Sequence, residues 1–199
     1  GAPLGISPPS ASGLQTSFGT PTKALHAGLP ARGGELAAQL AASGMTASRS
    51  WLVGRHGMLQ AYGGDTPPEA AEDVVRAGMD GHGITTAMGL VQKPYTSCGC
   101  SHAAVDAVVA ITGDLGPDDI ARIEVHVDPA VTRTMRETVV SDPFDSRYSV
   151  SWVVAVAATD GTAGPAQFSP TSIARPEVLA LRERVDVVAP SRRVEWPQY

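Results

Sequence analysis

The sequence predicts an α+β fold, in which a helical part comes first and a smaller α/β part follows. Two observations support this prediction. Apolar residues recur with helical spacing from Thr22 to Gly44, whereas the chain after residue 83 changes to segments typical of strand, helix and strand. Between the two parts, residues 78–83 contain three glycines, a composition typical of a domain boundary.

The helical part is expected to contain one long helix and several short ones. Thr22 is a residue type that caps helix N-termini, and Gly44 is one that ends helices. Leu25, Leu29, Leu36 and Leu40 share roughly one face of the helix between them. Shorter helical segments are expected within 8–18, 55–62 and 66–77.

The second part alternates strands and helices. Alternation of apolar and polar residues over 120–127 predicts a half-exposed strand, and 150–159 is apolar on nearly every side, which predicts a buried helix closed by Asp160-Gly161. The remaining expected elements are strands at 84–90 and 185–188 and helices at 101–112 and 176–183.

Composition and charge limit the function classes. A chain of 199 residues, 43% of them hydrophobic, fits one large or two small domains. Its net charge of −5, without a block of like charges, argues against nucleic acid and acidic membranes as partners. The apolar run 103–111 is far shorter than the ~20 residues that span a bilayer. No signal-peptide pattern opens the chain, and we expect a cytoplasmic protein.

The two cysteines argue against a metal centre. Cys98 and Cys100 are separated by one residue, closer than the usual Cys-x-x-Cys spacing of zinc and redox sites. Two thiols are also too few for a cluster held by four cysteines. The sequence therefore predicts no metal and no cofactor, and two free thiols that are half-buried.

Lysine use points to an anionic substrate. Of the 15 basic residues only Lys23 and Lys93 are lysines, and each lies in a dense polar motif that also contains a histidine. Arginine supplies a permanent forked charge, whereas lysine supplies a compact point charge whose pKa moves readily on burial. We therefore expect a local site for an anion around these motifs.

Four motifs, in this order, resemble the MmgE/PrpD superfamily, which includes 2-methylcitrate dehydratase and cis-aconitate decarboxylase. The motifs are Gly-Thr-Pro-Thr-Lys-Ala-Leu-His-Ala-Gly at 19–28, the glycine-flanked segment 54–63, Lys-Pro-Tyr at 93–95 with His-Ala-Ala-Val-Asp at 102–106, and Arg-Tyr-Ser-Val-Ser-Trp-Val-Val-Ala at 147–155 before Asp160-Gly161. The resemblance implies part of an all-helical domain over 1–78, an α/β lid domain over 79–146 and a return toward the helical domain over 147–199.

The resemblance also implies an activity. Family members act on small di- and tricarboxylates without a metal, by water elimination, decarboxylation or epimerisation next to a carboxylate. Such chemistry needs cations for the carboxylates, a group that exchanges protons, and donors for the developing negative charge. Histidines that the family uses for proton transfer belong to an earlier helical segment, so the catalytic set is expected to be incomplete in this chain.

Position by position, the resemblance assigns site residues. Lys23 matches the active-site lysine of the family, and Lys93 and His102 match the lysine and histidine of its lid; these three are the expected catalytic residues. Asp106 lies one turn after His102 and either orients its imidazole or is a solvated helix charge. The expected substrate-binding residues are Thr20, Thr22, Tyr148 and Trp152, the last at a position where many members carry tyrosine.

A rival prediction is a non-catalytic carboxylate-binding or assembly subunit, half of a split protein. Trp152 favours this prediction, because an indole N–H donates a hydrogen bond but does not exchange protons as a phenol does. A third possibility is an excised fragment without activity. The resemblance suggests dimers, and exposed Ala/Leu helix faces need a cover, so we expect either a homodimer or a partner chain that supplies missing helices.

Overall fold

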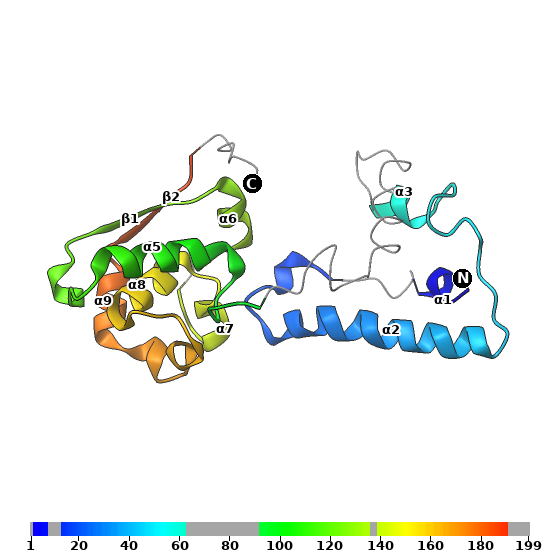
Figure 1. The fold of residues 1–199 in the computed structure, drawn as a ribbon, viewed down its shortest axis with the longest axis horizontal. Helices are drawn as coiled ribbons and strands as arrows, with labels where there is room; N and C mark the ends of the chain where they lie inside the picture. Colours follow the sequence, from blue (N-terminus) through cyan, green and yellow to red (C-terminus); the bar gives the residue numbers. More distant parts are fainter. Residues whose placement is uncertain (1, 8–12, 63–91, 136–138, 191–199) are drawn as a thin grey trace. The chain divides into compact units, whose positions relative to one another are not determined.

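The computed structural model describes residues 2–7, 13–62, 92–135 and 139–190 (Figure 1). These residues form two compact units. The first contains residues 2–7, 13–14, 22–62 and 92, and the second contains residues 15–21, 93–135 and 139–190. The helix expected at 66–77, the glycine-rich boundary at 78–83 and the strand expected at 84–90 lie outside the described residues.

The first unit is helical. Its elements are α1 (Ala2–Ile6), a 3-10 turn (Pro21–Ala24), α2 (Leu25–Ala42) and α3 (Met58–Tyr62). The long predicted helix is confirmed as α2, but the expectation that Thr22 caps it is wrong. The N-cap is Ala24, which makes no side-chain capping bond, because the chain already winds into the preceding 3-10 turn.

Helix α2 ends next to the glycine that the sequence predicted as its stop. Gly44 has a φ of 94°, in the left-handed region that glycine adopts without a Cβ clash. The Gly44 N–H donates to the Ala41 carbonyl at 3.1 Å, and the Met45 N–H donates to the Leu40 carbonyl at 3.0 Å. These two bonds form a Schellman motif, which satisfies carbonyls that the end of the helix would otherwise leave unpaired.

Three of the four leucines of α2 face solvent within this chain, and the fourth, Leu40, is half-buried. Leu25, Leu29 and Leu36 are 53%, 39% and 48% exposed, whereas Gly33 and Ala37 are buried. The helix therefore packs through its small residues, and its leucine side carries apolar surface. No helix in the described part of the chain is both long enough and apolar enough to cross a membrane.

The second unit combines helices with a small sheet, which confirms the α+β class. Helix α8 lies at its centre and contacts α5, α9 and β2. The helices are α5 (His102–Thr112), α6 (Pro129–Thr134), α7 (Pro143–Ser146), α8 (Val150–Asp160) and α9 (Pro176–Arg182), and the strands are β1 (Ile123–His126) and β2 (Val185–Val188). The helices predicted at 101–112, 150–159 and 176–183 and the strand predicted at 185–188 are confirmed.

The two strands pair in parallel. Ile123 lies opposite Val185 and His126 opposite Val188. The N–H of Ile123 donates to the Arg184 carbonyl at 2.9 Å. Strand β1 is shorter than the predicted 120–127, because the chain leaves a 3-10 turn only at Ile120. A parallel pair needs a long crossover, and here helices α6 to α9 supply it.

Helix α8 forms the core of the second unit because all its sides are apolar. Its residues from Val150 to Ala158 are all buried. The Ser149 hydroxyl accepts the Trp152 N–H at 3.2 Å and so caps the first turn. The unit spans both sides of the boundary expected at 146–147, and the division into domains there stays a prediction.

One partly buried ion pair ties the end of α8 to the start of α9. Arg175 donates from both guanidinium Nη atoms to Asp160, at 2.8 and 2.9 Å, and Gln167 donates to the same carboxylate at 3.0 Å. Burial by itself would raise the pKa of Asp160, but the hydrogen bonds from Arg175 and Gln167 outweigh it and lower the pKa below its ordinary value.

We predict that Asp160→Asn lowers the free energy of unfolding by about 2 kcal/mol at neutral pH, because a charge-assisted, two-pronged pair is lost. Since the folded-state pKa is lowered, the contribution of Asp160 is present at neutral pH and is lost as the pH falls through that pKa, below 3.8. Urea unfolding of both proteins at a series of pH values measures this. Equal stabilities at pH 7 would contradict the prediction.

Gly161, like Gly44, has a positive φ that favours glycine. It caps α8 with φ 69° and ψ 9°, and an added Cβ would meet nothing within 4 Å. We therefore expect Gly161→Ala to cost about 1 kcal/mol through backbone strain alone. Gly34→Ala is the matched control, since Gly34 lies inside α2 with equally open space. Gly34→Ala should instead increase helix stability. Thermal melts followed by circular dichroism should therefore show a lower melting temperature for Gly161→Ala and a higher one for Gly34→Ala.

Candidate functional site

The polar segment 93–102 leads into α5 and is held by backbone hydrogen bonds. The Thr96 N–H donates to the Ala163 carbonyl at 3.0 Å, and the Cys98 N–H donates to the Arg147 carbonyl at 2.9 Å. Both acceptors lie far along the chain, on either side of α8. The segment therefore has a defined position on the core of the second unit.

The Ser97 carbonyl brings two predicted catalytic residues together. Lys93 donates from Nζ to this oxygen at 3.4 Å, and the Nε2 atom of His102 lies 3.3 Å from it. Ser97 is buried, and its hydroxyl accepts from the Ser101 hydroxyl at 2.8 Å. The Lys93 side chain is exposed and His102 is half-buried, so a cation and an imidazole lie together at the surface of the unit.

Tyr95 and Asp106 flank this pair. The Tyr95 hydroxyl donates to Asp106 Oδ1 at 2.5 Å, and the Tyr95 ring lies edge-on to the His102 ring with 5.4 Å between centroids. The hydrogen bond to Asp106, then burial, then the Asp106 charge raise the pKa of Tyr95. Asp106 thus contacts Tyr95, an arrangement that neither sequence-based interpretation of Asp106 contained. Tyr95 stands in the Lys-Pro-Tyr motif but was not predicted as a site residue.

Tyr148 lies beside the two cysteines. Burial, followed by the proximity of Cys98, raises the pKa of Tyr148 to about 12, against an opposing effect of Arg147. Its hydroxyl therefore stays protonated at neutral pH and can donate a hydrogen bond. Burial also raises the pKa of the Cys100 thiol, with a further contribution from Cys98. Neither Tyr148 nor Cys100 is poised as a base at neutral pH.

Part of the first lysine motif packs near Tyr148 in the same unit. Phe18 packs against Tyr148 with the rings tilted by 42° and their centroids 5.7 Å apart. Gly19 is buried with φ 83°, and a Cβ there would lie 3.6 Å from Asp145 Oδ1 and 3.9 Å from the Tyr148 ring. The Thr20 hydroxyl donates to the Ser17 carbonyl at 2.7 Å, so in this structure it stabilises the local turn.

Thr22 and Lys23 belong to the first unit. Both lie in the Pro21–Ala24 turn, where Thr22 is exposed and Lys23 is half-buried. Lys93 and His102 belong to the second unit. The convergence of Lys23 and Lys93 on one substrate stays a prediction.

Trp152, which we expected beside the substrate, lies in the hydrophobic core. Its exposed fraction is 0%, and its ring packs against Phe168 with 5.2 Å between centroids. A dissolved ligand has no access to this side chain in the structure. The physical reason is that α8 is apolar all round and is surrounded by α5, α9 and β2.

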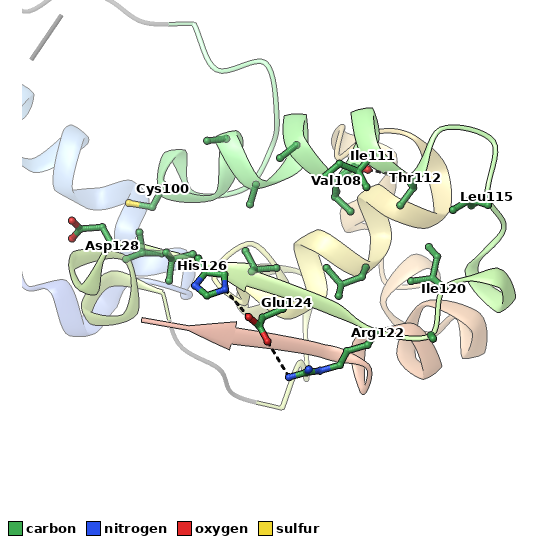
Figure 2. A pocket seen from close by; sticks show the side chains of 18 of the residues that line it. Cys100, Val108, Ile111, Thr112, Leu115, Ile120, Arg122, Glu124, His126 and Asp128 are labelled. Carbon is green, nitrogen blue, oxygen red and sulfur yellow. Dashed lines mark hydrogen bonds and ion pairs between the residues drawn. The ribbon is translucent and has the colours of Figure 1, made fainter. Parts of the chain in front are cut away.

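A well-defined hollow lies elsewhere, between α5 and β1 (Figure 2). It has a volume of about 780 Å³ and is lined mainly by apolar side chains. The charged groups on β1 and at Arg122, just before it, already pair with one another, since Glu124 contacts His126 at 2.6 Å and Arg122 at 3.2 Å. Neither Lys93 nor His102 lines the hollow, although Cys100 does.

The polar cluster, not the hollow, is the better candidate for binding an anion. A carboxylate needs a cation or aligned donors, and the cluster presents Lys93 and His102 for this purpose. In the hollow, Arg122 is already paired with Glu124 and Asp186, while Asp119 and Asp128 add negative charge that repels an anion. Among the described residues, no three histidine, cysteine or acidic side chains gather where they could hold a metal ion.

Comparison with known proteins gives one family match. Residues 95–193 match the family model described as MmgE/PrpD C-terminal domain. No curated protein sequence matches the chain at a significant level. The matched segment includes His102, Asp106 and Tyr148, whereas Lys23 and Lys93 precede it.

Proposed function

The chain belongs to the MmgE/PrpD family through its residues 95–193, and from this premise we propose that it carries part of the site of a metal-independent lyase or isomerase of small di- or tricarboxylic acids. One observation carries the proposal. The ammonium group of Lys93 and the imidazole of His102 both reach the Ser97 carbonyl, so a carboxylate-binding cation and a proton-exchanging group are neighbours.

The chemistry follows from these two groups. Lys93 binds a carboxylate of the substrate and stabilises the enolate-like charge that develops when a proton leaves the neighbouring carbon. His102 exchanges that proton, since imidazole is the side chain that changes charge most readily near neutral pH. The protonated Tyr148 hydroxyl is a further donor on the same unit. Water elimination and epimerisation begin with removal of this proton, whereas decarboxylation releases CO2 and then needs a proton delivered; all three use a cation for the carboxylates and a group that exchanges a proton.

The first unit supplies the remaining predicted residues. We propose that Lys23 binds a second carboxylate and that Thr22 positions substrate oxygens, with Thr20 shaping the turn before them. The complete site is assembled either in a homodimer or with a partner chain that supplies further helices. A partner also explains the exposed leucines of α2, because apolar surface of that kind is normally covered. A cytoplasmic location belongs to the same proposal.

A second candidate function is a non-catalytic carboxylate-binding or assembly subunit. The observation that favours it is the burial of Trp152, whose indole N–H does not exchange protons as a phenol does, at a position where the family often carries a tyrosine. In this alternative Lys93 still binds an organic acid, and no turnover follows.

Turnover and binding, measured on the same protein, separate the two functions. The chain is incubated with 2-methylcitrate, citrate or cis-aconitate, and the ultraviolet absorbance of an unsaturated product is followed. Calorimetry measures the binding of citrate in parallel. Turnover that disappears in His102→Gln supports the enzyme, and binding without turnover supports the alternative. The absence of both binding and turnover would refute the proposed site.

A further inference from the structure

A backbone carbonyl beside the His102 ring bears on which ring nitrogen carries the hydrogen. Nε2 lies 3.3 Å from the Ser97 carbonyl oxygen. A carbonyl oxygen only accepts hydrogen bonds, so a hydrogen bond at this position requires that Nε2 carries the hydrogen. The lone pair of the neutral ring is then on Nδ1.

The surroundings of the Ser97 carbonyl keep it in position to favour the tautomer with the hydrogen on Nε2. Ser97 is 1% exposed, and the Ser101 hydroxyl donates both to the Ser97 hydroxyl and to the Cys98 carbonyl, each at 2.8 Å. The Cys98 N–H is itself bonded to the Arg147 carbonyl. A carbonyl oxygen has two lone pairs, so it can accept from Lys93 and from His102 together.

The orientation of the ring is set from its other side. Tyr95 lies edge-on to His102, with 87° between the ring planes, and its hydroxyl is fixed by the 2.5 Å bond to Asp106. Asp106 is one turn beyond His102 on α5, so Tyr95 spans from the loop to the helix across the imidazole. A hydroxyl bonded to a carboxylate is a strong restraint on a ring that would otherwise rotate.

We infer that Nδ1 of His102 is the atom that exchanges the proton, that the Ser97 carbonyl fixes the Nε2–H tautomer, and that Tyr95 and Asp106 are positioning residues for the ring. The role of Nδ1 rests on the proposed function, whereas the tautomer and the positioning do not. In the forward step the Nδ1 lone pair takes the proton from the carbon next to the carboxylate. The C–H electron pair stays on the substrate as enolate, and the ring becomes imidazolium.

Nitrogen-15 NMR of the full chain tests the inference without any substrate. Long-range proton–nitrogen correlations at a pH where histidines are neutral show which ring nitrogen carries the hydrogen, and His102→Gln assigns the signals. One hydrogen bond should shift the ratio of the two tautomers about fivefold toward Nε2–H, relative to the same residue in the urea-unfolded chain. An unchanged ratio, or a dominant Nδ1–H form, would overturn the tautomer assignment.

Matched variants test the positioning residues. Tyr95→Phe and Asp106→Ala should move the ratio back toward that of the unfolded chain, while Asp106→Asn, which keeps an acceptor for the Tyr95 hydroxyl, should restore most of it. Tyr62→Phe is the control, because Tyr62 is 69% exposed and lies in the other unit. Circular dichroism confirms that each variant is folded. A folded Tyr95→Phe protein with the wild-type ratio would reject the positioning role.

These results are independent of turnover. A chain that shows the Nε2–H tautomer and no conversion of any acid contradicts the proposed enzyme alone. A chain that converts an acid but carries the hydrogen on Nδ1 contradicts the inference alone.

Discussion

Trp152→Ala is expected to lower the free energy of unfolding by about 4 kcal/mol, the largest effect of any single change considered for this protein. The side chain has no exposed surface, and it packs against Phe168 inside the cluster that α8 forms with α5 and α9. Removing a large ring from such a position forfeits its burial and leaves a cavity that close-packed neighbours fill only in part. Urea unfolding followed by far-ultraviolet circular dichroism measures the loss.

Two companion changes separate packing from ligand binding. Trp152→Phe keeps most of the volume and removes a buried indole N–H that has no hydrogen-bond partner among the described residues, so it should cost only about 1–2 kcal/mol. Ile111→Ala, at a residue that is 80% exposed, should change stability by less than about 0.5 kcal/mol. A Trp152→Ala protein of unaltered stability that has lost only ligand binding would show that the side chain belongs to the binding site.

Lys93→Ala is expected to weaken the binding of citrate about 100-fold. A charge-assisted hydrogen bond to a carboxylate contributes up to about 3 kcal/mol, and Lys93 supplies the exposed cation of the cluster. Isothermal titration calorimetry of citrate measures the change. If the chain turns over an acid, the ratio kcat/KM should fall by a similar factor, since the same cation stabilises the enolate-like charge.

Two control variants accompany Lys93→Ala: one keeps the positive charge at residue 93, and the other removes a cation elsewhere in the same unit. Lys93→Arg keeps the charge but replaces a point charge with a planar fork. It should therefore retain binding, so that kcat falls more than KM changes. Arg122→Ala removes a cation from the same unit whose guanidinium is already paired with Glu124 and Asp186, and citrate binding should not change. Equal affinities of the wild-type and Lys93→Ala proteins would contradict the proposed site.

Local sequence patterns predicted most elements of the second unit. The strand 185–188 and the helices α5, α8 and α9 follow from apolar spacing, because each pattern matches the period of one kind of secondary structure. The Asp160-Gly161 stop was equally clear, since a glycine tolerates the left-handed cap. The start of α2 was predicted wrongly from Thr22, because an N-cap depends on where the preceding chain bends, and the 3-10 turn moved that point to Ala24.

The site residues named from the sequence stay predictions, and the structure shows only where their side chains lie. Lys93 and His102 were named from one motif, and they lie together because the eight residues of loop and 3-10 turn between them fold so that both side chains reach the Ser97 carbonyl. That carbonyl carries no side-chain signal, so no motif could reveal it. Trp152 was misplaced because a tryptophan in an apolar helix is compatible with either a core or a pocket, and only packing on Phe168 distinguishes them.

By itself the sequence determined the fold class and the family and predicted which residues form an anion site, because periodicity and motif spacing are properties of neighbouring residues. Only the tertiary structure decided which of those residues meet, since contacts between distant segments depend on how helices and strands pack. It bonded Tyr95 to Asp106, buried Trp152 and placed the Lys93 and His102 side chains at one oxygen atom. Hydrogen-bonding partners such as a backbone carbonyl become visible only when the chain is folded.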